Sequence, residues 1–234
     1  MRSIRNLTEA YSRYRFACLF VSLLLTLTAA PVFSAMGMST RVMEVFLGVS
    51  LLAAVLLTVH RWGSRVGVGL IVVFVVARVG YVLLGNKGLL ITSQGGGVGI
   101  CLLSLLIMLR HILSDGPVTA GRIFAALDVY MMIGIMCGLL FNIFEEQWPG
   151  SFSIQGGALP EGSKVQLAHT LYFSFVTLGT LGYGDILPVS GPARALAVME
   201  SIGGQMYLVV VVARLVSLYQ GPADKNGSGT RGTA

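Results

Sequence analysis

A short polar stretch late in the chain has the residue types needed to coordinate a cation that has lost its water. Residues 180–185, TLGYGD, carry two glycines, two hydroxyls and one acid between hydrophobic runs. Because glycine adopts left-handed backbone conformations freely, Gly182 and Gly184 would let successive carbonyls aim at a common axis. Carbonyl oxygens arranged in this way can replace the hydration shell of a cation. The flanking elements must hold this stretch in place, and they are strongly apolar.

The composition indicates a membrane protein. Of the 234 residues, 55% are hydrophobic and 11% are charged, whereas soluble domains carry about 25% charged residues. The net charge of +6 comes from short basic clusters that form no continuous face for nucleic acid. The three cysteines lie in hydrophobic runs without metal-ligand spacing, and the three histidines are dispersed. We therefore expect no nucleic-acid partner, no cofactor and no enzymatic activity.

Six segments are long and apolar enough to cross a membrane, since a spanning helix needs about 20 mainly apolar residues. They are 16–36, 42–59, 66–84, 89–109, 122–144 and 193–218. Residues 94–97, QGGG, interrupt the fourth segment, so its helix is expected to begin as late as Val98. A further apolar stretch, 165–178, is too short to cross and is interpreted as a re-entrant half-helix. The predicted fold is all-α, with six transmembrane helices and this half-helix.

The lysine and arginine residues predict the orientation, because basic residues favour the cytoplasmic side. With the N-terminus inside, eleven of them lie in inner segments, four in outer segments, and Arg78 lies within the third span. Both termini of this multi-pass chain are therefore expected in the cytoplasm, and residues 177–188 in the outer half of a plasma or inner membrane. A cleaved signal peptide at the N-terminus is an alternative that would leave the later helices in the same orientation.

Residues 172–185, YFSFVTLGTLGYGD, resemble the pore helix and selectivity filter of tetrameric potassium channels, whose filter usually reads TVGYGD. The flanks agree, since a short helix precedes the filter, Pro188 follows it, and the final helix has glycines midway. The resemblance is strong over 122–218 and absent as a motif over 1–110. It implies a potassium-selective channel.

In that family, successive oxygens of the filter coordinate potassium. The resemblance implies that the ion-binding residues are Thr180, Leu181, Gly182, Tyr183 and Gly184. A threonine hydroxyl would lie at the inner mouth, backbone carbonyls would follow above it, and the tyrosine ring would brace the filter.

Three residues are expected to support the filter, namely Thr177, Tyr172 and Asp185. Asp185 has a candidate aromatic partner in Tyr172 or Tyr183, and four copies of it around an axis would concentrate cations at the mouth. The C-terminal end of the half-helix carries partial negative charge, which would favour a cation in a cavity below the filter.

Two residues depart from the family pattern. Leu181 replaces the usual valine or isoleucine, and Gly179 stands where threonine is common, which is expected to loosen the last turn of the half-helix. Both departures bear on the rigidity of the filter. Two alternatives therefore stand beside a potassium channel: a weakly selective monovalent cation channel and a non-conducting membrane sensor.

The chain contains one filter segment and no internal repeat of it, so a complete pore requires a fourfold homotetramer. The expected partners are other copies of the chain and membrane lipids. The expected domains are a cytoplasmic N-terminus (1–15), a four-helix transmembrane domain (16–111), a linker (112–121), the pore module (122–218) and a disordered cytoplasmic tail (219–234).

The last span is expected to line the inner pore. Gly203 and Gly204 lie where the family has a hinge glycine, although close helix packing explains them nearly as well. The candidates for a cavity-facing stripe at helical spacing are Gln205, Leu208, Val212 and Val216. Rings of valine in a narrowed pore could stop ion flow by dewetting.

Ionisable residues within membrane spans are functional hypotheses. They are Glu44, Arg78, Asp128 and Glu200. Glu44 and Arg78 are expected to pair, and Asp128 has Arg110 or His111 as possible partners. Glu200 is expected either to hydrogen-bond behind the filter or to line the outer cavity.

The fourth span carries no arginine before Arg110, at its inner end. A voltage sensor needs several arginines at three-residue spacing on this span. Gating is therefore predicted to be nearly independent of voltage.

Overall fold

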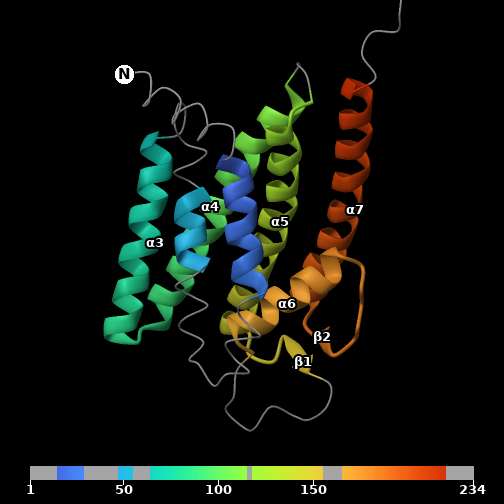
Figure 1. Ribbon diagram of the computed structural model, residues 1–234. Helices are drawn as coiled ribbons and strands as arrows, with labels where there is room; N and C mark the ends of the chain where they lie inside the picture. Colours follow the sequence, from blue (N-terminus) through green and yellow to red (C-terminus); the bar gives the residue numbers. More distant parts are fainter. Residues whose placement is uncertain (1–14, 29–46, 55–63, 115–117, 155–164, 220–234) are drawn as a thin grey trace, which may run out of the picture.

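The structure is a computed structural model that describes residues 15–28, 47–54, 64–114, 118–154 and 165–219 (Figure 1). In chain order its elements are α3 (Ser64–Leu84), α4 (Lys87–Leu113), α5 (Ala120–Gln147), β1 (Phe152–Ile154), α6 (Leu167–Leu178), β2 (Ile186–Pro188) and α7 (Gly191–Tyr219). Two helical segments precede them, Arg15–Thr28 and residues 47–54.

Four of the described helices, α3, α4, α5 and α7, are long and apolar enough to cross a membrane. The bounds of α3, α5 and α7 agree with the predicted third, fifth and sixth spans to within three residues. The short helix predicted before the filter is also confirmed, since α6 has 12 residues and is too short to span.

The first two predicted spans are covered only in part. Residues 15–28 and 47–54 are helical, whereas the remainder of both spans, Glu44 and most of the two predicted termini lie outside the described residues. A total of six spans therefore stays a prediction.

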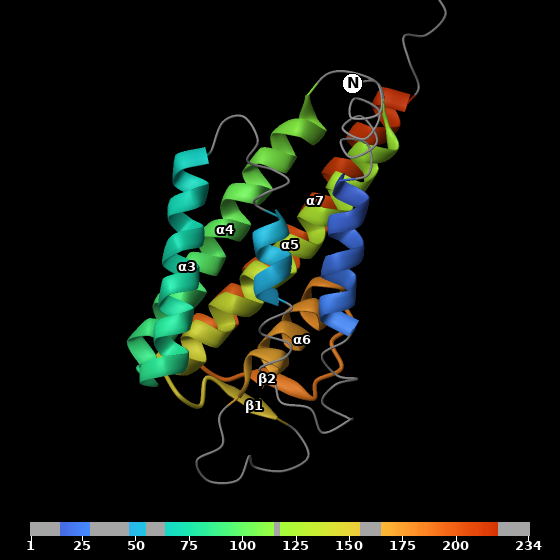
Figure 2. The same ribbon diagram turned by 60° about the vertical axis from the view of Figure 1, so that its left-hand side comes forward.

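The fourth helix begins eleven residues earlier than Val98, at Lys87, so the expected interruption at 94–97 is wrong. Three of these residues, Gln94, Gly96 and Gly97, are buried against the neighbouring helices. A methyl group at Gly96 would lie 3.3 Å from the Phe74 Cα of α3, and one at Gly97 would lie 3.1 Å from Leu139 of α5. The Gln94 amide donates a hydrogen bond to Asn142 of α5. The glycines are tolerated because they let α4 fit between α3 and α5 (Figure 2).

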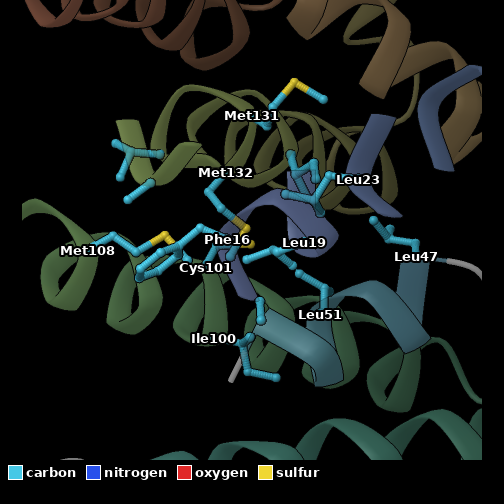
Figure 3. Close-up of a cluster of buried hydrophobic side chains, with 14 of the residues drawn as sticks. Phe16, Leu19, Leu23, Leu47, Leu51, Ile100, Cys101, Met108, Met131 and Met132 are labelled. Atoms are coloured by element: carbon cyan, nitrogen blue, oxygen red, sulfur yellow. The ribbon is translucent and has the colours of Figure 1, made fainter. Parts of the chain in front are cut away.

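A buried apolar cluster joins the earlier helices to the pore module (Figure 3). Leu19 and Leu51, from the two short helical segments, meet Ile100 of α4 and Met132 of α5, and none of the four exposes more than 1% of its surface. The helices before α5 are thus packed against it along a shared core.

Most of α3 faces away from this core. Its valines are exposed, among them Val72, Val76, Val79 and Val82. Exposed valine is favourable in a bilayer, because lipid tails are as apolar as the side chain. The pattern is typical of a helix at the lipid boundary.

One small sheet departs from the expected all-α fold. β1 and β2 pair antiparallel, with Ser153 opposite Leu187. The Ser151 carbonyl also accepts a hydrogen bond from the Val189 N–H at 2.7 Å. The extended segments after α5 and after the filter thereby satisfy each other's backbone groups and join the two sides of the half-helix.

Candidate selectivity filter

The backbone of residues 180–184 alternates in handedness. Thr180, Gly182 and Gly184 have φ angles of 56°, 57° and 76°, and every second residue is therefore left-handed. The two glycines were expected from the sequence, whereas left-handed Thr180 was not. Alternation of this kind turns successive carbonyls toward a common direction, as a carbonyl filter requires.

Thr180 is left-handed because it also ends α6. The Leu181 N–H donates to the Val176 carbonyl at 2.9 Å, and the Thr180 N–H donates to the Thr177 carbonyl at 3.0 Å. This is the hydrogen-bond pattern of a Schellman cap, in which the residue after the cap is usually glycine. A β-branched residue in that position is strained.

Gly179 does not loosen the half-helix in the way that was expected. Its N–H donates to the Phe175 carbonyl at 2.9 Å, so the last turn keeps its hydrogen bonds. A Cβ at this position would lie 3.0 Å from that carbonyl oxygen, which leaves little room for a threonine.

Two glycines of α5 let the half-helix pack closely against that helix. A methyl group at Gly134 would lie 2.6 Å from the Phe175 ring, and one at Gly138 would lie 2.6 Å from Leu171. The Tyr130 hydroxyl of α5 donates to the Leu178 carbonyl at 2.9 Å, where α6 ends. These residues were missed in the sequence, although the spacing of Gly134 and Gly138 is the small-xxx-small pattern of packed membrane helices.

Gly204 of α7 takes the close-packing role, which was one of its two expected roles. A methyl group there would lie 2.4 Å from Leu178 of α6, whereas one at Gly203 would meet no described atom within 4 Å. The helix α7 continues through both residues. The small residue at 204 therefore lets α7 approach the C-terminal end of the half-helix.

Glu200 lies behind the half-helix. It exposes 3% of its surface, and its Oε1 atom lies 2.5 Å from the Ser174 Oγ of α6. The same Ser174 Oγ lies 2.6 Å from the Gly134 carbonyl oxygen of α5, and the Cys137 thiol is beside the carboxyl. Glu200 was expected either to hydrogen-bond behind the filter or to line the outer cavity; the structure shows a hydrogen bond with the half-helix that precedes the filter.

Asp185 follows the filter and is partly buried. It has a side-chain hydrogen bond with Tyr172, one of its two expected partners. Its Oδ1 atom also accepts a hydrogen bond from the Ile186 N–H at 3.1 Å. The contact with Tyr172 ties the outer end of the filter to the half-helix.

The expected partners of Asp128 are wrong. Asp128 is fully buried, and within the described part of the chain neither of its carboxylate oxygens has a hydrogen-bond partner. Arg110 is exposed, and His111 instead stacks on Phe16, with ring centroids 5.5 Å apart. Asp128 lies close enough to Tyr207 of α7 to act on it electrostatically.

The pairing of Glu44 with Arg78 is untested, since Glu44 lies outside the described residues. The Arg78 guanidinium lies 5.7 Å from the centre of the Tyr81 ring. A cation–π contact at that distance contributes up to about 1 kcal/mol when it is exposed.

The predicted pore-facing stripe of α7 is exposed in the single chain. It consists of Gln205, Leu208, Val212 and Val216. A neighbouring stripe of α7 holds Gly204, Tyr207, Val211 and Leu215, which pack against the rest of the chain. The centres of the two stripes are about 100° apart around the helix, so the predicted pore-facing stripe borders the packed one and is left exposed beside it.

Comparisons with known proteins agree with the resemblance. Residues 152–221 match a family model described as ion channel. Over 132 residues the chain is 30% identical to the voltage-gated potassium channel Kch of Escherichia coli (strain K12), a match that covers 56% of this chain and 28% of that relative. No solved structure matches the chain. The resemblance to a potassium-channel-like family is thereby confirmed, and the region matched by the family model includes the filter and α7.

Proposed function

We propose that this chain is one subunit of a homotetrameric, potassium-selective channel of the cell membrane, with both termini in the cytoplasm. The observation that carries the proposal is the left-handed backbone at residues 180, 182 and 184, directly after a half-helix that is too short to span. Backbone carbonyls of this arrangement bind a dehydrated cation without any catalytic group.

The exposure of the filter supports assembly into a ring. Leu181 and Tyr183 expose 58% and 65% of their surfaces in the single chain, although such residues are expected to be enclosed at membrane depth. The face of α7 beside the pore-facing stripe is also exposed and apolar. It includes Val198, Met199, Ile202, Met206 and Val209.

Fourfold symmetry accounts for both surfaces. A closed ring repeats one heterologous interface, so each subunit needs a surface for the pore axis and another for its neighbour. In the ring the Tyr183 rings would be braced by adjacent copies, and the filter carbonyls would meet at the axis.

A weakly selective monovalent cation channel is the second candidate. It is favoured by strain at Thr180, whose φ angle is 56°, and by the leucine at position 181, where the family usually has valine or isoleucine. A filter that is held less firmly would discriminate less sharply between potassium and sodium.

Ion flux in proteoliposomes tests the proposal. The purified protein is reconstituted, and efflux is measured under a potassium gradient and under a matched sodium gradient, with protein-free liposomes as the control. We expect potassium flux that greatly exceeds sodium flux. Equal fluxes would favour the second candidate, and no flux from correctly assembled protein would refute a channel.

The oligomeric state is a separate measurement. Light scattering or native mass spectrometry in detergent is expected to give four subunits per particle. A stable monomer or dimer in membranes would contradict the ring.

A further inference from the structure

The Ser174 hydroxyl lies between two oxygen atoms on different helices. Its Oγ is 2.6 Å from the Gly134 carbonyl oxygen of α5 and 2.5 Å from the Glu200 Oε1 of α7. The first distance is ordinary for an O–H···O hydrogen bond, and the second is at the short end of the range. Ser174 itself belongs to α6, so this group of atoms joins the three helices α5, α6 and α7.

The number of protons available decides how these bonds are arranged. A serine hydroxyl has one proton, and a backbone carbonyl can only accept. The short contact with Gly134 therefore takes the Ser174 proton. A second proton must lie between Ser174 and Glu200, and the carboxyl group is the one source for it in that contact.

The surroundings of Glu200 agree with a neutral group. The residue is 3% exposed, and its side-chain hydrogen-bond partner besides Ser174, among the described residues, is the Cys137 thiol, which is a weak donor. The ionisable groups that act on it from α5 are the Cys137 thiol and the Tyr130 hydroxyl, and no described lysine or arginine pairs with it. An ionised carboxylate buried in this way would lack the compensation that buried charges require.

We propose that Glu200 is a protonated carboxylic acid that donates a hydrogen bond to Ser174, while Ser174 donates to the Gly134 carbonyl. Glu200 is then a positioning residue. It fastens the half-helix to α5 and α7 at a point six residues before Thr180, where the filter begins. Because it carries no charge, it does so without competing for the permeant cation.

Infrared spectroscopy tests the protonation state directly. The difference spectrum between wild type and Glu200→Gln, recorded at neutral pH, is expected to contain the carbonyl-stretch band of a protonated carboxylic acid. Ser174→Ala should shift that band, because it removes the hydrogen-bond partner. Asp128→Asn is the matched control, since it removes a second buried carboxyl and should leave the Glu200 band in place. Carboxylate bands in the Glu200→Gln difference spectrum would overturn the proposal.

Permeability ratios test the positioning role. The amide of Glu200→Gln can still donate to Ser174, so this variant should keep its tetramer and its potassium-to-sodium permeability ratio. Glu200→Ala and Ser174→Ala should each lower the ratio by about tenfold, the order expected for one lost buried hydrogen bond. The double variant should lose little more, because the two residues act in one chain of bonds. Loss of the tetramer or of selectivity in Glu200→Gln would contradict the positioning role.

A negative result in one of these two tests leaves the other test valid. The permeability test rests on the proposed channel function, whereas the infrared test needs only the folded protein. A carboxylic-acid band without ion flux would therefore refute the channel and leave the protonated Glu200 in place.

Discussion

Gly182→Ala isolates the backbone geometry of the filter from its packing. The φ angle of Gly182 is +57°, and a methyl group added there meets no described atom within 4 Å. The cost of the substitution is therefore conformational. An L-residue in the left-handed region loses about 1–2 kcal/mol, which becomes about 4–8 kcal/mol over four subunits of a ring.

The backbone can avoid this cost by rotating the peptide groups next to residue 182. Such a rotation would turn carbonyls away from the pore axis and remove oxygens that replace the water of the ion. We therefore expect potassium flux in proteoliposomes to be abolished, while the amount of tetramer changes little. Full potassium flux through Gly182→Ala would refute the filter assignment.

Gly85→Ala is a matched control for this experiment. Gly85 lies in the turn between α3 and α4 with a φ angle of +64°, and an added methyl group there also meets no atom of the described residues within 4 Å. The two substitutions carry the same conformational cost at different places. Gly85→Ala is expected to keep potassium flux, and its loss would mean that strain alone, at any position, stops conduction.

Three further predictions concern the filter, the packing of α7 against the half-helix, and gating. Leu181→Val should keep potassium current and lower sodium permeability, measured as reversal potentials in mixed salt. An unchanged sodium-to-potassium permeability ratio would show that Leu181 does not cause sodium permeation. Gly204→Ala should destabilise the folded protein by about 1–3 kcal/mol through overpacking against Leu178, whereas Gly203→Ala should not. Thermal unfolding in detergent compares the two, and equal stabilities would contradict the packing role of Gly204. Open probability should change only shallowly with voltage, because Arg78 crossing half the membrane in four subunits would contribute about 4–5 kcal/mol per 100 mV. A steep sigmoid in planar-bilayer recordings would show that a voltage sensor was missed.

Features that depend on short stretches of sequence could be predicted. Hydropathy located α3, α5 and α7 to within three residues, because burial in lipid requires an apolar run of a certain length. The same requirement identified the apolar stretch that forms α6 as too short to cross the membrane. The left-handed backbone at Gly182 and Gly184 was predictable because handedness is a local property of each residue.

The same local reasoning failed for residues 94–97. Glycine lowers helix propensity, and the sequence alone offers no reason to continue a helix through three of them. The helix continues because Gly96 and Gly97 lie against Phe74 and Leu139, which are distant in the chain. Packing against neighbours overrides propensity in this helix.

The order of residues was enough to locate the helices that are apolar enough to cross a membrane, the end of the half-helix and the glycines that adopt a left-handed backbone. Which side chains meet could be read from the packed helices alone. Their arrangement gave Glu200 the hydroxyl of Ser174 as a partner, and it left Asp128 without the basic partners that were expected. The physical reason is that a side chain's partner depends on the rotation and spacing of whole helices, and these are set by small residues such as Gly134 and Gly204 at the contacts between them.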